Sequence, residues 1–166
     1  MTRAPKTAAP KPAAEKTYRF AQRTSPEKVE AGHVFAPKFD EDGLITCIVT
    51  DAWSSDVLMV AYMNAQALGR TIDTKQAWFY SRSRKSLWRK GEQSGHGLRV
   101  VEMRVDCDQD TLWIRVEQIG PGVCHTGRRT CFYRSVHLDE PASPSTTLEF
   151  RDGEMVFDPK EVYGKK

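Results

Sequence analysis

Three aspartates and a cysteine share five consecutive positions of the sequence, Asp106-Cys107-Asp108-Gln109-Asp110. If the backbone is extended there, the three carboxylates point to one side and the Cys107 thiol to the other. Carboxylates suit a hard cation such as Mg²⁺ or Ca²⁺, whereas a thiolate suits Zn²⁺. A solvated turn is the simpler interpretation, because Asp is a favoured turn residue. The adjacent thiol makes us prefer a metal site, with Asp106, Asp108 and Asp110 as its ligands.

Two further cysteines, Cys124 and Cys131, enclose a second reactive segment, CHTGRRTC, with His125 beside the first of them. Their spacing is not that of a CxxC zinc knuckle. With Cys107 they make three thiolates, which would leave one zinc position open for water, as at a catalytic zinc. The alternative is a pair of buried free thiols beside an exposed histidine, since unpaired cysteines are often buried. Cys47, which lies in an apolar run, fits that alternative.

Residues 81–96 form a strongly basic segment, SRSRKSLWRKGEQSGH, in which no acid precedes Glu92. Arginine offers two parallel hydrogen bonds to a phosphate and lysine a point charge, so the segment suits phosphate monoesters. RNA binding, with Trp88 as a stacking platform, is a rival interpretation. A solvated basic loop is the simplest one.

The elements that must position these segments are mostly strands. We expect strands over 44–49, 57–63, 76–81, 101–105 and 112–116, and a short one within 132–136. Asn64 can cap a short helix that carries Leu68 and Ile72 on one face. In 101–105 and 112–116 apolar residues recur at every second position, and the acidic segment joins the two strands as a hairpin. The pattern predicts an α+β fold, mostly antiparallel β-sheet with one or two short helices.

The 166 residues are enough for one domain with a substantial core. We expect a disordered Ala/Pro/Lys-rich arm over 1–30, the folded domain over 35–137 and a C-terminal extension over 138–166. Within the extension, the composition of residues 139–147 is typical of a linker. The last 20 residues weakly predict a strand-turn-strand, with Asp152-Gly153 as the turn.

The net charge of +3 arises in the first 30 residues, where seven basic side chains face three acidic ones. The remaining 136 residues are nearly neutral, which argues against a protein built to hold nucleic acid. No apolar run could span a membrane, and the N-terminus lacks the apolar region of a secretory signal. An organellar transit peptide is the alternative, but no serine occurs before Ser25. We therefore expect a cytoplasmic protein whose cysteines are thiols or metal ligands.

The segments together resemble the phosphoribosyl-AMP cyclohydrolases of histidine biosynthesis, over roughly residues 35–135. The matching strings are GLI at 43–45, LMVAYMN at 58–64, YSRSRKSLWRKGEQSGH at 80–96, DCDQD at 106–110 and CHTGRRTCFYR at 124–134. The resemblance implies a monofunctional enzyme that is a homodimer with active sites at the subunit interface. It also implies Zn²⁺ held by Cys107 of one chain with Cys124 and Cys131 of the other, and Mg²⁺ held by Asp106, Asp108 and Asp110.

The resemblance further implies a substrate, 1-(5-phosphoribosyl)-AMP, whose adenine ring is opened by hydrolysis between N1 and C6. Zinc would activate the attacking water. His125 and His96 are candidate acid/base groups, because imidazole titrates near neutral pH. The candidate substrate- and phosphate-binding residues are Arg82, Ser83, Trp88, Lys90 and Ser94, although Trp88 could equally be a core residue.

The expected partners are this small phosphorylated nucleotide and a second copy of the chain, with neither nucleic acid nor membrane. Two alternatives come from other functional classes. One is a zinc-stabilised RNA-binding module without catalysis, and the other is a zinc dimer with a purely structural role.

Overall fold

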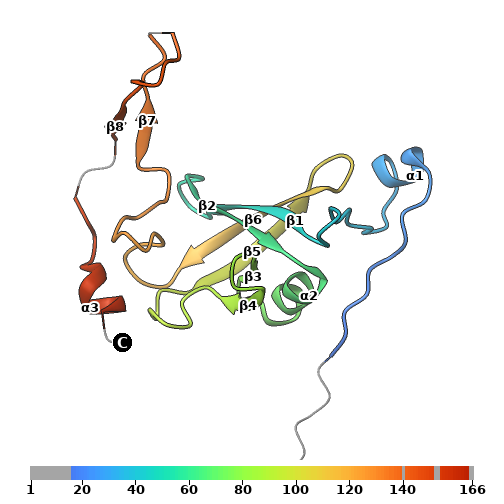
Figure 1. Cartoon of the computed structure of the whole chain (residues 1–166). Coiled ribbons are helices and arrows are strands. Elements are labelled where there is room, and N and C mark those ends of the chain that lie inside the picture. Colours follow the sequence, from blue (N-terminus) through green and yellow to red (C-terminus); the bar gives the residue numbers. More distant parts are fainter. Residues whose placement is uncertain (1–15, 140, 152–153, 165–166) are drawn as a thin grey trace, which may run out of the picture.

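The computed structural model describes residues 16–139, 141–151 and 154–164. Its centre is a four-stranded sheet in the order β2-β1-β6-β5 (Figure 1). The strands are β1 (Ile45–Asp51), β2 (Val57–Met63), β5 (Leu98–Val105) and β6 (Thr111–Gln118). The β1–β2 and β5–β6 pairs are antiparallel hairpins, and the two inner strands, β1 and β6, run parallel. The predicted α+β fold with mostly antiparallel strands is confirmed.

One face of the sheet is covered by the chain between β2 and β5. This segment forms helix α2 (Ala65–Thr74) and a hairpin of β3 (Trp78–Ser81) and β4 (Ser86–Arg89). The helix begins at Asn64, whose side chain accepts a hydrogen bond from the Ala67 N–H at 2.9 Å, as its predicted capping role requires. None of the helices in the described ranges is long and apolar enough to cross a membrane.

The core lies between the sheet and this cover. Leu112, Ile114 and Val116 alternate along β6 and are fully buried, as the period of two predicts. Phe79 of β3 and Leu68 of α2 close the core from the other side. The wholly buried Cys47 belongs to the same cluster, and burial raises the pKa of its thiol, so it is a core residue as its apolar run indicated.

Strand β5 differs from its predicted pattern. The alternation of Val101, Met103 and Val105 indicated a buried face. Met103 packs against the core as predicted, but Val101 and Val105 are exposed, and the most buried residues of this strand are Leu98 and Val100. The pairing of β5 with β6 shifts register between Val100 and Glu102. A bulge of this kind inserts one residue, so Val101 is displaced from the core side. Beyond the bulge the predicted face is kept: Met103 pairs with the buried Ile114, and Val105 pairs with the buried Leu112 but is exposed at the end of the strand.

The N-terminal prediction is corrected for residues 16–30. Helix α1 (Pro26–Glu30) lies in this range, and Phe20 packs edge-on against Phe35 with ring centroids 5.5 Å apart. Tyr18 lies against Gly69 of α2, where a Cβ atom would come within 2.1 Å of the tyrosine ring. Two aromatic side chains thus anchor a segment whose overall composition indicated disorder. Residues 1–15 lie outside the described ranges.

The C-terminal extension contains one predicted strand and one unexpected helix. Strand β8 (Leu148–Phe150) pairs with β7 (Arg134–Val136), which lies within the short strand expected over 132–136. The second strand of the expected strand-turn-strand is absent from residues 154–164, where helix α3 (Pro159–Tyr163) forms instead. Its predicted turn at residues 152–153 lies outside the described ranges.

Candidate active site

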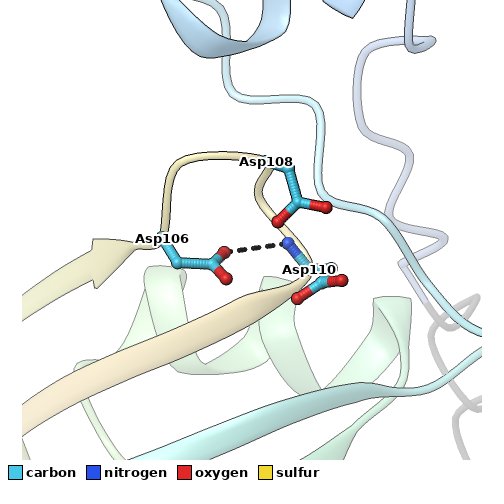
Figure 2. A group of neighbouring side chains, drawn as sticks. All are labelled: Asp106, Asp108 and Asp110. Atoms are coloured by element: carbon cyan, nitrogen blue, oxygen red, sulfur yellow. Dashed lines mark hydrogen bonds between the residues drawn. The ribbon is translucent and has the colours of Figure 1, made fainter.

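The acidic segment forms a tight turn between β5 and β6 (Figure 2). The Asp106 carboxylate accepts hydrogen bonds from the backbone N–H groups of Asp110 and Thr111, both at 3.0 Å. Gln109 has a φ of 58°, so the backbone reverses here and is not extended as the alternation argument assumed. The turn nevertheless gathers one carboxylate oxygen from each of Asp106, Asp108 and Asp110 within 4.8 Å of one another.

A lysine from the N-terminal side of the domain balances this negative charge. The Lys38 ammonium lies 3.1 Å from Asp108 and 3.2 Å from Asp110. The hydrogen bond from Lys38 lowers the pKa of the Asp110 carboxyl. The hydrogen bonds to Asp108 and Asp110 in turn raise the pKa of Lys38. Three converging carboxylates, two of which already contact a cation, are a fitting set of hard oxygen ligands for Mg²⁺.

The side chain of Gln109 ties the acidic turn to the N-terminal segment. It is buried, and its Oε1 accepts a hydrogen bond from the Ala36 N–H at 2.8 Å. Its Nε2 donates to the carbonyls of Val29 and Val34 at 3.1 and 3.2 Å. The amide therefore satisfies three backbone groups of a segment more than 70 positions away, which holds the turn in place.

Cys124 and Cys131 lie next to each other in the loop that follows β6. The Cys124 thiol is 3.0 Å from the Thr126 hydroxyl, and the Cys131 N–H donates to the Leu58 carbonyl at 2.8 Å. Burial, reinforced by Cys124, raises the pKa of the Cys131 thiol to about 12. Cys131 is nonetheless exposed. Protein surrounds its thiol, but the residue lines a cavity through which water can reach it.

Lys90 is the charged neighbour of both thiols. It is only 8% exposed, and its ammonium donates to the Val123 carbonyl at 2.5 Å. Burial lowers the pKa of Lys90, while negative charge on Cys131 and Cys124 would raise it. Its position beside the thiols suits charge balance there, in addition to the phosphate binding predicted for this lysine.

A cavity of about 560 Å³ opens beside the thiols. Its volume falls in the range that accommodates small-molecule ligands such as a nucleotide. Five of the predicted site residues line it: Trp88, Lys90, Ser94, His125 and Cys131. Two lining residues, Arg84 and Tyr163, were not selected from the sequence. Arg84 belongs to the basic run and was a candidate by composition, whereas Tyr163 comes from α3, in the C-terminal extension that the resemblance excluded.

Three of the predicted acid/base and phosphate-binding residues lie outside the cavity wall. Arg82 stacks over the Tyr62 ring at 4.1 Å, and the Ser83 hydroxyl lies 3.4 Å from that of Ser81 in the β3–β4 turn. His96 packs edge-on against Phe157 at 4.6 Å. Within the described ranges, the His96 Nδ1 is buried without a hydrogen-bond partner.

Cys107 is separated from the other two predicted zinc ligands. It lies exposed in the acidic turn before β6, whereas Cys124 and Cys131 lie in the loop after this strand. Eight residues of strand span roughly 25 Å. Across the part of the chain that the structure describes, the only clustered set of three or more potential metal ligands is the aspartate group.

These features define an α+β protein with a cation-lined, nucleotide-sized cavity beside a pair of thiols. A sequence model of the phosphoribosyl-AMP cyclohydrolase family matches residues 59–133, which contain both the acidic turn and the thiol loop. A phosphoribosyl-AMP cyclohydrolase of Rhodopseudomonas palustris (strain HaA2) is 58% identical over 139 residues, 84% of this chain and 93% of the relative.

Two Nitrobacter proteins of the same name are equally similar. The relative from Nitrobacter winogradskyi is 58% identical over 142 residues, which cover 86% of this chain and 96% of the relative. The relative from Nitrobacter hamburgensis is 57% identical over 143 residues, which cover 86% of this chain and 95% of the relative. The chain belongs to the phosphoribosyl-AMP cyclohydrolase family, hydrolases of histidine biosynthesis, and the resemblance seen in its motifs is confirmed.

Proposed function

We propose that this protein hydrolyses the N1–C6 bond of the adenine ring of 1-(5-phosphoribosyl)-AMP, a step of L-histidine biosynthesis. The observation that carries the proposal is the cavity lined by His125, Cys131 and cations of the basic segment. Its volume suits a nucleotide, and its cations suit phosphate groups. The family to which the chain belongs supports the same substrate.

We further propose that Cys124 and Cys131 hold a zinc ion together with Cys107 from a second copy of the chain. The two neighbouring thiols provide soft ligands, and the third thiol is exposed, so it is free to meet another molecule. When bound, the zinc ion would activate water for attack on C6. The enzyme is then a homodimer in which neither chain contains a complete zinc site.

Apolar residues at the surface of the sheet favour such a dimer. Val60, Ile48 and Trp113 are paired across β2, β1 and β6, and Val60 remains exposed. Trp53, in the β1–β2 loop, is 84% exposed. Exposed apolar groups of this kind are a usual component of subunit interfaces.

The aspartate turn would hold Mg²⁺, which replaces the Lys38 ammonium as the positive partner of Asp108 and Asp110. The three carboxylate oxygens already converge. Binding of Mg²⁺ would therefore displace the Lys38 side chain, while the turn itself would move less. We assign no separate chemical step to this cation.

The cavity residues divide into two roles. His125 is our first candidate for delivering a proton to the departing N1, because it lies in the wall beside Cys131. His96 is the second candidate from the sequence, although its ring packs against Phe157 and does not line the cavity. Arg84, Lys90 and Ser94 would bind phosphate, and Trp88 would cover the purine. Arg82 and Ser83 remain predicted phosphate ligands, although neither lines the cavity.

A cytoplasmic location is also part of the proposal. All four cysteines are free in the structure, the state expected in a reducing compartment.

A direct assay tests the proposed reaction. The purified protein is incubated with phosphoribosyl-AMP while ring opening is followed by absorbance, before and after the metals are removed with a chelator. We expect activity that disappears on metal removal and returns with Zn²⁺ and Mg²⁺ together. If a folded, zinc-loaded protein leaves the substrate intact, the proposed function is wrong.

A further inference from the structure

The C-terminal segment, residues 154–164, is seated on the loop that carries the thiols. The Val156 N–H donates to the Gly127 carbonyl at 2.7 Å. At Gly127 a Cβ atom would lie 2.5 Å from the Phe157 carbonyl, so only glycine permits this close approach. The Phe157 ring also packs against His96. The segment therefore contacts two of the segments that build the cavity.

Helix α3 carries this segment to the cavity wall. The Asp158 side chain accepts a hydrogen bond from the Lys160 N–H at 2.8 Å, and Pro159 occupies the first helical position, so the helix starts at a defined residue. In Figure 1, α3 lies apart from the β7–β8 hairpin. Tyr163, in its last turn, completes the wall that also contains Ser94 and His125.

Tyr163 has an unused hydroxyl at this position. Its ring is half-buried and lies 6.4 Å from that of Phe157. Within the described ranges its hydroxyl has no hydrogen-bond partner. A tyrosine offers a flat apolar face that can cover a base and a hydroxyl that can bond to ribose or phosphate.

We propose that Tyr163 contacts the bound nucleotide and contributes to its affinity, so that the C-terminal segment is part of the active site. The inference rests on the proposed function, because the nucleotide is the ligand assigned to this cavity. The residues matched by the family model end at position 133, so this contact lies outside that match. Tyr163 is thus a substrate-binding residue additional to those identified from the motifs.

Steady-state kinetics and equilibrium binding test the assignment. Tyr163→Ala and Tyr163→Phe are compared with the wild type and with Glu161→Ala, an exposed position of the same helix that does not line the cavity. We expect Tyr163→Ala to raise KM about tenfold, as loss of an aromatic contact to a base does, with little change in kcat. The affinity for AMP, measured by calorimetry, should fall by a similar factor.

The control and the fold are checked in the same set. Glu161→Ala should keep the wild-type KM and AMP affinity, and all variants should share one melting temperature, since α3 is peripheral to the core. Tyr163→Phe should fall between wild type and Tyr163→Ala if the hydroxyl bonds to the nucleotide, or match wild type if the ring alone makes contact.

The results separate the two proposals. If the wild type opens the ring but folded Tyr163→Ala keeps its KM and AMP affinity, the role of Tyr163 is wrong and the proposed function stands. If the wild type binds AMP in a Tyr163-dependent way but opens no ring, the proposed reaction is wrong and the contact stands. A wild type that neither binds AMP nor turns over the substrate would overturn both.

Discussion

At the scale of single residues, Lys90 shows how tightly charge is balanced beside the thiols. A buried ammonium group is costly unless negative charge or hydrogen bonds compensate it. Here it has the Val123 carbonyl and the two thiols as neighbours. Three thiolates around one Zn²⁺ would carry a net negative charge, which a buried lysine is well placed to offset.

Replacing Lys90 by methionine should weaken zinc binding. Lys90→Met keeps most of the volume of the side chain but removes the charge, so we expect zinc affinity to fall by roughly tenfold or more, as for other groups that support metal ligands. Competition with a chromophoric chelator measures it. Lys85→Met, an exposed cation of the same segment, is the control and should leave the affinity unchanged. Equal affinities for the two variants would contradict a role for Lys90 at the thiols.

Zinc binding should also depend steeply on pH. The pKa of Cys131 is about 12 in the metal-free protein, so this thiol is protonated at pH 7 and must lose its proton to bind zinc. Protons therefore compete with the metal, and apparent affinity should rise about tenfold per pH unit for each thiol proton released. Competition titrations at pH 6, 7 and 8 measure the slope. An affinity independent of pH would show that the thiols are not the ligands.

At the scale of elements, the acidic turn depends on a segment far away in the chain. Gln109 connects the turn to residues 29–36 through three hydrogen bonds, and Lys38 contacts the carboxylates directly. The N-terminal segment thus positions a candidate metal site to which it contributes no carboxylate.

Gln109→Gly separates the side-chain bonds from the backbone conformation. Glycine relieves the positive φ at this position but deletes the amide, which leaves buried backbone groups unpaired at about 1–3 kcal/mol. We expect lower stability to urea and weaker Mg²⁺ binding. Lys75→Gly is a matched control, because Lys75 also has a positive φ, of 57°, and ends α2 as its C-cap. This control should be neutral or slightly stabilising, and the same result at Gln109 would show that its amide is dispensable.

At the scale of the whole molecule, the position of Cys107 decides how many chains make an active site. One strand separates it from Cys124 and Cys131, and the turn and the loop lie at opposite ends of that strand. The proposed homodimer resolves this separation, because each zinc site would take Cys107 from one chain and the other two thiols from its partner.

Mixing two inactive variants tests shared sites. Cys107→Ser and Cys124→Ser should each be inactive alone, since each lacks one zinc ligand in every site. After unfolding and refolding together in equal amounts, half of the dimers are mixed, and each of these has one intact site. About a quarter of wild-type activity should therefore return. Sites contained within single chains would give no recovery, because every chain would still lack a ligand.

Local patterns in the sequence were reliable where the decisive neighbours are close along the chain. The alternation in β6, the cap at Asn64 and the apolar strand β2 all depend on periodicity or on contacts within a few residues, and the structure has them as predicted. The motifs were specific enough to indicate the family, because a shared order of reactive residues carries that information without any geometry. The composition of residues 16–30 misled because two aromatic side chains outweigh the polar residues around them.

The exposures and contacts that only the tertiary structure decided depend on residues that are distant in the chain. The bulge in β5 reverses the exposure of Val101, and it exists only in the pairing with β6. Gln109 is buried because residues 29–36 fold over it, and Lys90 is buried because the thiol loop closes on it. Tyr163 reaches the cavity wall because α3 docks on a glycine more than 30 positions earlier. The sequence by itself determined which residues have the chemistry and which family they belong to; the packing of distant segments decided which of them meet, because burial and contact come from the whole folded chain.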